Sequence, residues 1–338
     1  VHTINLSNCT NITDEGLNCL IGVHNINLTR CSVTSDGIKA LAGVHTIQLQ
    51  CCKLKDNCIK ALAKGGVHSI NLSYSQVTNK GIKALAGVHT VMLMNCYNFS
   101  DRSIKALAGV HTIHVSKCEG ITADGIKALA GAHEIDFKGC RVGDDCIKAF
   151  SGVHTINLWK SKVTDKGVKA LAGVHTINLG RTSVSDKGIK SLAGVHTILL
   201  CAANRISDDG IKALAGVHTI DLSQNKLVTD EGVMALAGVH KISLRNCIKV
   251  TDKGVKHLAG VHTIYLSGTN VTDEGVKALA GVHKISLVEC QVTDKGVRAL
   301  AGAHIIDLRS CYGVDALRKQ NRFLYTFRHS KIFEKLFL

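Results

Sequence analysis

The sequence contains no proline, a single tryptophan and no apolar run approaching the roughly 18 residues that a membrane-spanning helix needs. It also lacks the G-x-x-x-x-G-K-[ST] loop that cradles phosphates, any C-x-x-C pair and any recognisable signal peptide. Ser, His, Asp and Cys recur along the whole chain, so their co-occurrence does not mark a catalytic triad or a nucleophile. We therefore expect no enzyme activity, no cofactor, no transmembrane segment and an intracellular, cytoplasmic protein.

What the sequence does contain is a repeat of 21 to 23 residues that continues to about Cys311. Its clearest marker is a histidine, because fifteen of the eighteen histidines open a unit. These histidines are His2, His24, His45, His68, His89, His111, His133, His154, His175, His196, His218, His240, His262, His283 and His304.

A unit reads V-H-T-I-x-L-x-x-C-x-x-V-T-D-x-G-V-K-A-L-A-G. The alternating apolar residues, such as Ile156 and Leu158, predict a short strand with one buried face. The segment from Asp165 to Gly173 predicts a helix of about two turns, capped by the Asp and ended by the Gly. Since Ser35 and Asn79 replace this Asp, we interpret the position as one that needs a side-chain acceptor.

The Gly of T-D-x-G is replaced by Cys58, Ser103 and Cys146 in three units. This pattern indicates that the position needs a small residue and not a positive φ. We accordingly expect Gly167→Ala to cost below about 1 kcal/mol and a leucine there to cost clearly more.

A strand and a short helix cannot bury enough apolar surface alone, so the units must stack into a solenoid. The motif V-x-x-I-x-L-x-x-C-x-x-V resembles the L-x-x-L-x-L-x-x-N/C-x-L core of the leucine-rich repeat family, some fifteen times between Val1 and Cys311. The resemblance implies an α/β horseshoe with an all-parallel concave sheet of about 15 strands and short outer helices. It assigns 1–311 to the solenoid, and 312–338, where the repeat ends among Phe, Lys and Arg, to a helical cap.

The V-T-D-x-G run with cysteine is most similar to the cysteine-containing subfamily, known from F-box substrate receptors of ubiquitin ligases. This chain has shorter repeats, and no F-box is recognised in it. The resemblance implies a turn after each strand with small buried residues in the Asn/Cys position. Nine cysteines occupy it, and we expect them to be reduced thiols: Cys9, Cys31, Cys52, Cys96, Cys118, Cys140, Cys247, Cys290 and Cys311.

The net charge of +15 comes largely from one helix position, and without those twelve residues the net charge is +3. They are Lys39, Lys60, Lys83, Lys105, Lys127, Lys148, Lys169, Lys190, Lys212, Lys256, Lys277 and Arg298. A basic stripe at repeat spacing could follow a polyanion such as nucleic acid. We favour a solvated helix face, because no aromatic residues interleave with the stripe to stack bases.

The histidines do not form a metal motif. His111 and His114 are three residues apart on a strand, which places them on opposite faces and excludes shared ligation. We expect no metal site and interpret the histidine position as structural.

Binding is expected where the units differ, at strand positions that point away from the core, since the family resemblance implies a concave protein-binding sheet. The only tryptophan falls there, and aromatic and Arg side chains are favoured interface anchors. The expected partner-binding residues are His114, Lys117, Glu134, Asp136, Lys138, Trp159, Lys160, Arg181, Arg245 and Tyr265.

The sequence thus favours a non-enzymatic protein-binding module, with target recognition for a ubiquitin ligase as its most specific role by resemblance. Two alternatives stay open: a structural protein that self-associates head to tail into filaments, and a polyanion or nucleic-acid binder that uses the basic stripe.

Overall fold

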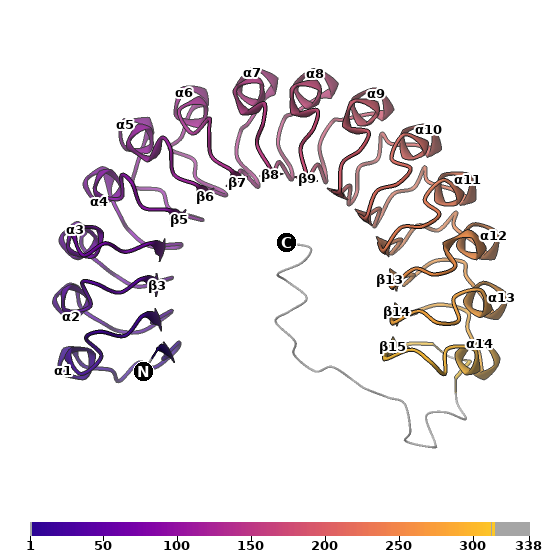
Figure 1. Cartoon of the computed structure of the whole chain (residues 1–338), viewed down its shortest axis with the longest axis horizontal. Helices are drawn as coiled ribbons and strands as arrows, with labels where there is room; N and C mark the ends of the chain where they lie inside the picture. The colour runs from indigo at the N-terminus through magenta and orange to yellow at the C-terminus, as the bar shows by residue number, and fades with distance from the viewer. Residues whose placement is uncertain (1, 312, 315–338) are drawn as a thin grey trace. The chain divides into compact units, whose positions relative to one another are not determined.

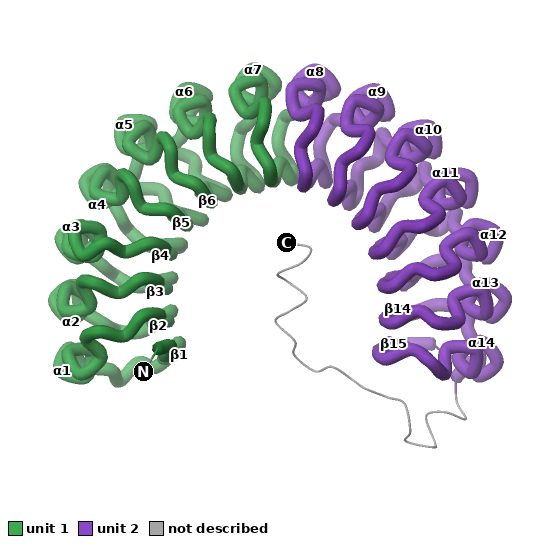
Figure 2. Tube along the Cα trace, viewed as in Figure 1, with its two compact units in different colours: residues 1–163 green, residues 164–338 purple. Residues whose placement is uncertain are grey.

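The computed structural model describes residues 2–311 and 313–314, and the chain divides into two compact units, residues 1–163 and 164–338 (Figure 2). Each unit repeats the same strand, turn and helix (Figure 1). The helical cap expected for 312–338 falls outside the described residues, apart from 313 and 314. Among the described helices, none is long and apolar enough to cross a lipid bilayer.

The strands are three residues long and parallel, and within each unit they pair in chain order. The first unit contains β1 (Thr3–Asn5), β2 (Asn25–Asn27), β3 (Thr46–Gln48), β4 (Ser69–Asn71), β5 (Thr90–Met92), β6 (Thr112–His114), β7 (Glu134–Asp136) and β8 (Thr155–Asn157). The second contains β9 (Thr176–Asn178), β10 (Thr197–Leu199), β11 (Thr219–Asp221), β12 (Lys241–Ser243), β13 (Thr263–Tyr265), β14 (Lys284–Ser286) and β15 (Ile305–Asp307).

The strand register stacks like residues on like. Ile198 in the middle of β10 pairs with Ile177 and Ile220 of the neighbouring strands, and all three are fully buried. Since side chains alternate along a strand, the residues on either side of this isoleucine face away from the core. The predicted solenoid repeat and its buried isoleucine position are therefore confirmed.

The helices lie on the opposite side of each unit from the open face of the strands (Figure 1). In the first unit they are α1 (Asp14–Asn18), α2 (Ser35–Ala40), α3 (Asp56–Lys64), α4 (Asn79–Ala84), α5 (Asp101–Ile104), α6 (Ala123–Lys127) and α7 (Asp144–Ile147). In the second they are α8 (Asp165–Val168), α9 (Asp186–Ile189), α10 (Asp208–Lys212), α11 (Asp230–Met234), α12 (Asp252–Val255), α13 (Asp273–Lys277) and α14 (Asp294–Arg298).

Most of these helices are shorter than the two turns that the sequence predicts. Five of them continue as a single 3₁₀ turn, namely Lys105–Leu107, Lys148–Phe150, Lys169–Leu171, Lys190–Leu192 and Lys256–Leu258. The chain then turns at a glycine such as Gly173, whose φ of 87° is unfavourable for other residues. The predicted role of this glycine in ending the helix is confirmed.

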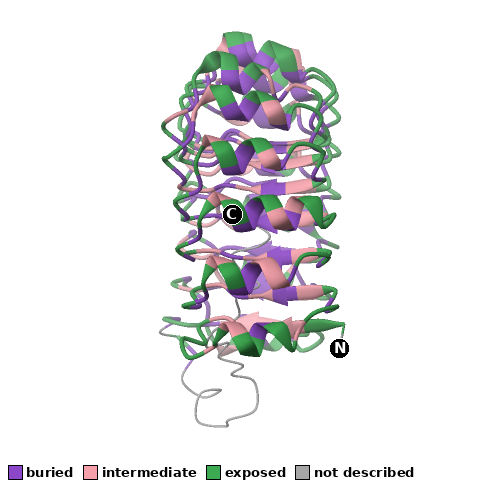
Figure 3. Ribbon diagram, turned by 90° about the vertical axis from the view of Figure 1, so that its left-hand side faces the viewer, coloured by how far each residue is buried: buried purple, intermediate pink, exposed green. Residues whose placement is uncertain are grey.

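The core of each repeat lies between strand and helix. Figure 3, a side view, shows exposed residues on the outer helix faces and loops and buried ones between the layers. In the repeat of β10, Val195, Ile198, Leu200, Ile211 and Leu214 are at most 4% exposed. Because each repeat contributes only a few such side chains, its apolar surface is covered by its neighbours.

The helix cap differs from the sequence prediction. The residue before the Asp is the N-cap, and in most described repeats it is a Thr or Ser whose hydroxyl accepts a hydrogen bond from the helix backbone. Thr229, for example, accepts from the Glu231 amide at 3.3 Å. Asp230 is already the first helical residue, so its carboxylate has another partner.

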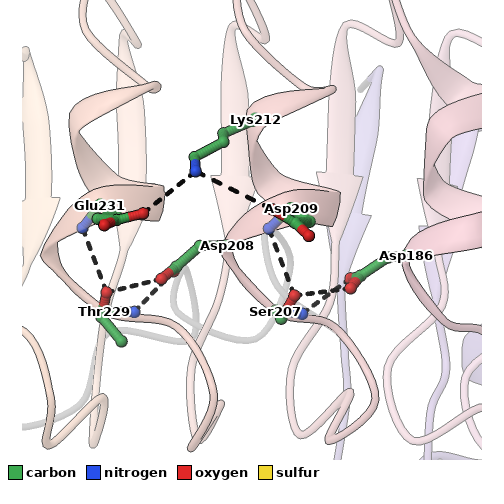
Figure 4. Close-up of polar contacts among 7 residues, drawn as sticks. All are labelled: Asp186, Ser207, Asp208, Asp209, Lys212, Thr229 and Glu231. Atoms are coloured by element: carbon green, nitrogen blue, oxygen red, sulfur yellow. Dashed lines mark hydrogen bonds and ion pairs between the residues drawn. The ribbon is translucent and has the colours of Figure 1, made fainter.

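That partner is the cap residue of the next repeat. Asp208 accepts from the backbone amide of Thr229 at 2.8 Å and from its hydroxyl at 2.6 Å, and Asp186 holds Ser207 in the same way (Figure 4). The predicted acceptor is confirmed also where Ser35 and Asn79 replace the Asp, with Ala123 as the exception, but the donor lies one repeat further on. The same side-chain contact joins Asp14 to Thr34, Asp56 to Thr78, Asp101 to Thr122, Asp165 to Ser185, Asp230 to Thr251, Asp252 to Thr272 and Asp273 to Thr293.

The glycine of T-D-x-G is explained by the same carboxylate. A Cβ added to Gly188 would lie 2.6 Å from Oδ1 of Asp165 and 2.8 Å from Cγ1 of Val184. Both distances are shorter than van der Waals contact, so we expect alanine at Gly188 to displace the Asp165 carboxylate and to cost more than the sequence alone suggests. The expectation for Gly167→Ala stays a prediction.

The exceptions fit this account. Where the preceding repeat has Ser35, Asn79 or Ala123 in place of Asp, the next repeat has Cys58, Ser103 or Cys146 in place of Gly. The constraint is therefore a contact between repeats, and each departure from Gly follows a departure from Asp.

The cysteine position forms a second ladder between repeats. Eight of its nine cysteines are buried as expected, whereas Cys9 in the first repeat is exposed. The thiol of Cys118 donates to the carbonyl of Leu93 at 3.0 Å, and that of Cys247 to the carbonyl of Leu222 at the same distance. The amide of Asn225 bonds the carbonyl of Leu200 at 2.9 Å. Burial raises the pKa of Cys247 to about 12, which keeps this thiol protonated.

Thiol labelling should distinguish these groups. The exposed residues Cys9, Cys19 and Cys51 should react with an aromatic disulfide reagent in the native protein, and half-buried Cys201 more slowly. The ten buried thiols should react only after denaturation. Peptide mass mapping checks the sites, and fast native labelling of Cys118 or Cys247 would contradict the assignment.

Candidate protein-binding surface

The first unit brings part of the predicted surface together on its strand face. His114 ends β6, while Glu134 and Asp136 are the first and last residues of β7. Lys138 and Trp159 each lie two residues after a strand and thus continue the same alternation. Five of the ten expected residues therefore share one open face.

His114 and Glu134 are paired across neighbouring strands. Nε2 of His114 lies 3.4 Å from Oε1 of Glu134, and both side chains are partly exposed. The hydrogen bond from His114 lowers the pKa of Glu134, against the opposing effect of burial. Glu134 is thus an anionic acceptor near neutral pH.

Trp159 forms the largest aromatic surface of this face. Nζ of Lys138 lies over its ring, 5.1 Å from the centroid, which is the geometry of a cation–π contact. The indole is half-buried, so one part packs against the protein and the rest faces solvent. A flat apolar ring held by a cation is suited to anchor a partner.

Asp136 also has a structural role. Its Oδ1 accepts a hydrogen bond from the backbone amide of Lys138 at 2.7 Å, and Asn157 does the same for Trp159 at 3.0 Å. These bonds fix the turn that presents the two side chains. Asp136 therefore positions the surface in addition to lining it.

Lys117, Lys160 and Arg181 lie beyond the ends of the strands, and their expected part in partner binding stays a prediction. They have φ values of 55°, 59° and 54° and occupy the turn that follows the strand. In the left-handed conformation the side chain leaves the alternation of the strand. Lysine and arginine seldom adopt such a φ, and the available signal was the same position in other repeats, where Asn95, Gly139 and Gly268 stand.

In the second unit Arg245 and Tyr265 form a separate cluster. The guanidinium carbon of Arg245 lies 4.6 Å from the Tyr265 ring centroid, and Nζ of Lys284 lies 5.8 Å from the same centroid. Beside them, Asp221 is 7% exposed and accepts from the Ser223 backbone amide at 2.8 Å. Burial raises the pKa of Asp221, against the hydrogen bonds and Arg245, which lower it.

Sequence reasoning missed Asp221. The available signal was a carboxylate between the buried Ile220 and Leu222, at a strand position that is asparagine in several other repeats.

The marker histidines, each directly before a strand, form a stack of imidazole rings. Within each unit, rings of successive repeats lie 4.3 to 4.6 Å apart, and His111 stacks on His89 and His133. His114 pairs with Glu134 and is not a member of this stack. Among the described residues, no group of three His, Cys, Asp or Glu side chains could hold a metal ion.

Part of the basic stripe is neutralised within its own helices. Nζ of Lys39 lies 2.6 Å from Asp36, and that of Lys277 contacts Glu274. Lys212 lies 3.1 Å from Glu231 of the next repeat and 3.9 Å from Asp209 (Figure 4). Such exposed pairs add little stability, but they weaken the field that a polyanion would meet.

Comparisons with known proteins agree with the fold. The family model described as Leucine Rich repeat matches residues 1–20, 67–86, 217–237, 261–280 and 282–301. No curated protein matches the chain.

Among solved structures, a leucine-rich-repeat protein of Leptospira interrogans matches with a TM-score of 0.56 and 15% identity, over 91% of this chain and 90% of that one. Rad7 in complex with Elc1 from yeast matches with a TM-score of 0.58 and 16% identity, over 79% and 82%. An internalin from Listeria monocytogenes matches with a TM-score of 0.52 and 15% identity, over 87% and 82%. The matched segments are leucine-rich repeats, and the chain folds as a leucine-rich-repeat solenoid.

Proposed function

We propose that the chain is a non-enzymatic module that binds a protein partner on the strand face of its first unit. The observation that carries the proposal is the half-buried Trp159 beneath Lys138, beside the His114–Glu134 pair. Framework positions hardly change between repeats, whereas this face changes from strand to strand. An aromatic anchor with both charge signs beside it suits recognition of one partner.

A more specific proposal is target recognition for a ubiquitin ligase. Its support is the resemblance to the cysteine-containing repeats of F-box receptors and the cysteine ladder that bonds one repeat to the next. A yeast protein of the same fold, Rad7, forms a complex with Elc1. Co-purification of ligase subunits with the tagged native protein tests this role, and their absence from the complex would count against it.

The change Trp159→Ala should weaken partner binding by about 2 kcal/mol, or roughly thirtyfold, as expected for an interface anchor. The ring is only half-buried, so the melting temperature should change little. After affinity capture has identified the partner, calorimetric titration of the purified proteins measures the effect.

A matched control changes the helix side of the same unit. Lys105, Lys127 and Lys148 are exposed there, and replacing all three by glutamine should leave partner binding intact. If this triple change abolishes binding and Trp159→Ala does not, the working surface is the basic stripe, and polyanion binding replaces the proposed function.

A further inference from the structure

The second unit has a basic pocket on the turns that follow its strands. Its volume is about 690 Å³, within the range of ligand sites. Arg181, Arg205 and Lys226 line it together with Gln224, Asn246 and Ile248. Among the described residues that line it, none carries a carboxylate.

Several residues that line the pocket occupy the left-handed turn after a strand. Arg181, Gln224 and Asn246 have φ values of 54°, 63° and 56°, one per repeat. The amide of Gln224 donates to the carbonyl of Arg245 at 2.7 Å, and that of Asn246 to Ser267 at 2.8 Å. Side chains that leave the turn in this conformation are therefore held at a fixed spacing.

Part of the pocket lining comes from loops that are longer than in the preceding repeats. The histidine spacing changes from 21 residues before His196 to 22 after it, and the added residue lengthens the loop that carries Arg205, Lys226 or Ile248. Nη1 of Arg205 donates to the carbonyl of Ser183 in the preceding repeat at 3.3 Å. This bond uses one of the five N–H groups of the guanidinium.

We propose that this pocket binds an acidic segment of a protein partner, through the carboxylates of Asp or Glu side chains. Arginine binds carboxylate through two parallel hydrogen bonds. The side-chain amides of Gln224 and Asn246 supply further donors. The pocket lining has no aromatic ring on which a base could stack, and this favours peptide over single-stranded nucleic acid. The proposal rests on the protein-binding function but involves different residues.

The test is direct titration of the full chain with a short fluorescent glutamate-rich peptide, followed by anisotropy at two salt concentrations. The change Arg205→Gln with Lys226→Gln should weaken binding about tenfold or more. The matched control, Lys187→Gln with Lys190→Gln, removes the same charge from exposed helix residues of the same unit and should leave binding nearly unchanged. Circular dichroism checks that both variants fold.

Three results would overturn the proposal. Equal losses in both variants would mean attraction to the net charge of the chain and not to the pocket. Tighter binding of single-stranded DNA, lost in the pocket variant, would assign the pocket to nucleic acid. Absence of peptide binding would reject the proposed function of the pocket. The Trp159→Ala experiment would still test partner binding on the strand face independently.

Discussion

Lowering the pH from about 7 to about 5 should lower the melting temperature of the chain by several degrees, because the stacked histidines cannot all be charged in the folded state. Partial desolvation and then the neighbouring histidines lower the pKa of His45, His89, His218 and His283. The unfolded chain therefore binds more protons than the folded one. Stability is fully present above the unfolded pKa of about 6.5 and falls as the pH drops below it.

Interrupting the histidine stack tests whether the stacked rings cause the acid sensitivity. His218 is flanked by His196 and His240, whose rings lie 4.5 and 4.6 Å from its own. Changing both neighbours to glutamine should raise the pKa of His218 in an NMR titration and reduce the acid sensitivity. The control is His257→Gln, a change outside the stack that should leave the acid sensitivity unaltered.

The carboxyl group of Asp221 has the opposite effect on stability over this pH range. Burial raises the pKa of Asp221, so this carboxyl favours the folded state on acidification and opposes the histidines. The melting temperatures at the two pH values are therefore also compared in the Asp221→Asn variant. A melting temperature that stays level or rises from about pH 7 to about pH 5 in both backgrounds would reject the histidine account.

The second large effect is expected from Gly188→Ala, which should destabilise the protein by about 2 kcal/mol. The new Cβ would displace the Asp165 carboxylate, which accepts from the Ser185 amide at 2.7 Å, the Ser185 hydroxyl at 2.6 Å and the Gly188 amide at 3.1 Å. These hydrogen bonds lower the pKa of Asp165, although burial alone would raise it. The helix propensity of alanine offsets less than about 1 kcal/mol of the loss.

A double-mutant cycle isolates the contact. The change Asp165→Ser with Gly188→Cys copies the natural pair of Ser35 and Cys58, and should cost at least about 1 kcal/mol less than the sum of the single changes. Denaturant unfolding followed by circular dichroism measures all four proteins. Additive effects would show that the two positions do not interact.

Much of the fold could be predicted from the sequence, because the patterns concerned are local to one repeat. Ile198 and Leu200 alternate with polar residues, and this period fixes the buried side of the strand whatever its neighbours are. The same reasoning placed Trp159 and Lys138 on one open face. It did not predict the left-handed turn at Lys117 and Lys160, because that φ is imposed by the turn between strand and loop and not by their side chains.

The sequence by itself determined the solenoid, the short strands, the buried cysteine position and the need for an acceptor at Asp165. Tertiary structure alone decided which donor that acceptor meets, because Asp165 and Ser185 are 20 residues apart and come together only through the offset between stacked repeats. It also decided that Gly188 must lack a side chain, and that Arg205 and Lys226 from neighbouring loops line one pocket. A periodic pattern specifies what each repeat contributes, whereas the contacts of those groups depend on how one repeat is placed on the next.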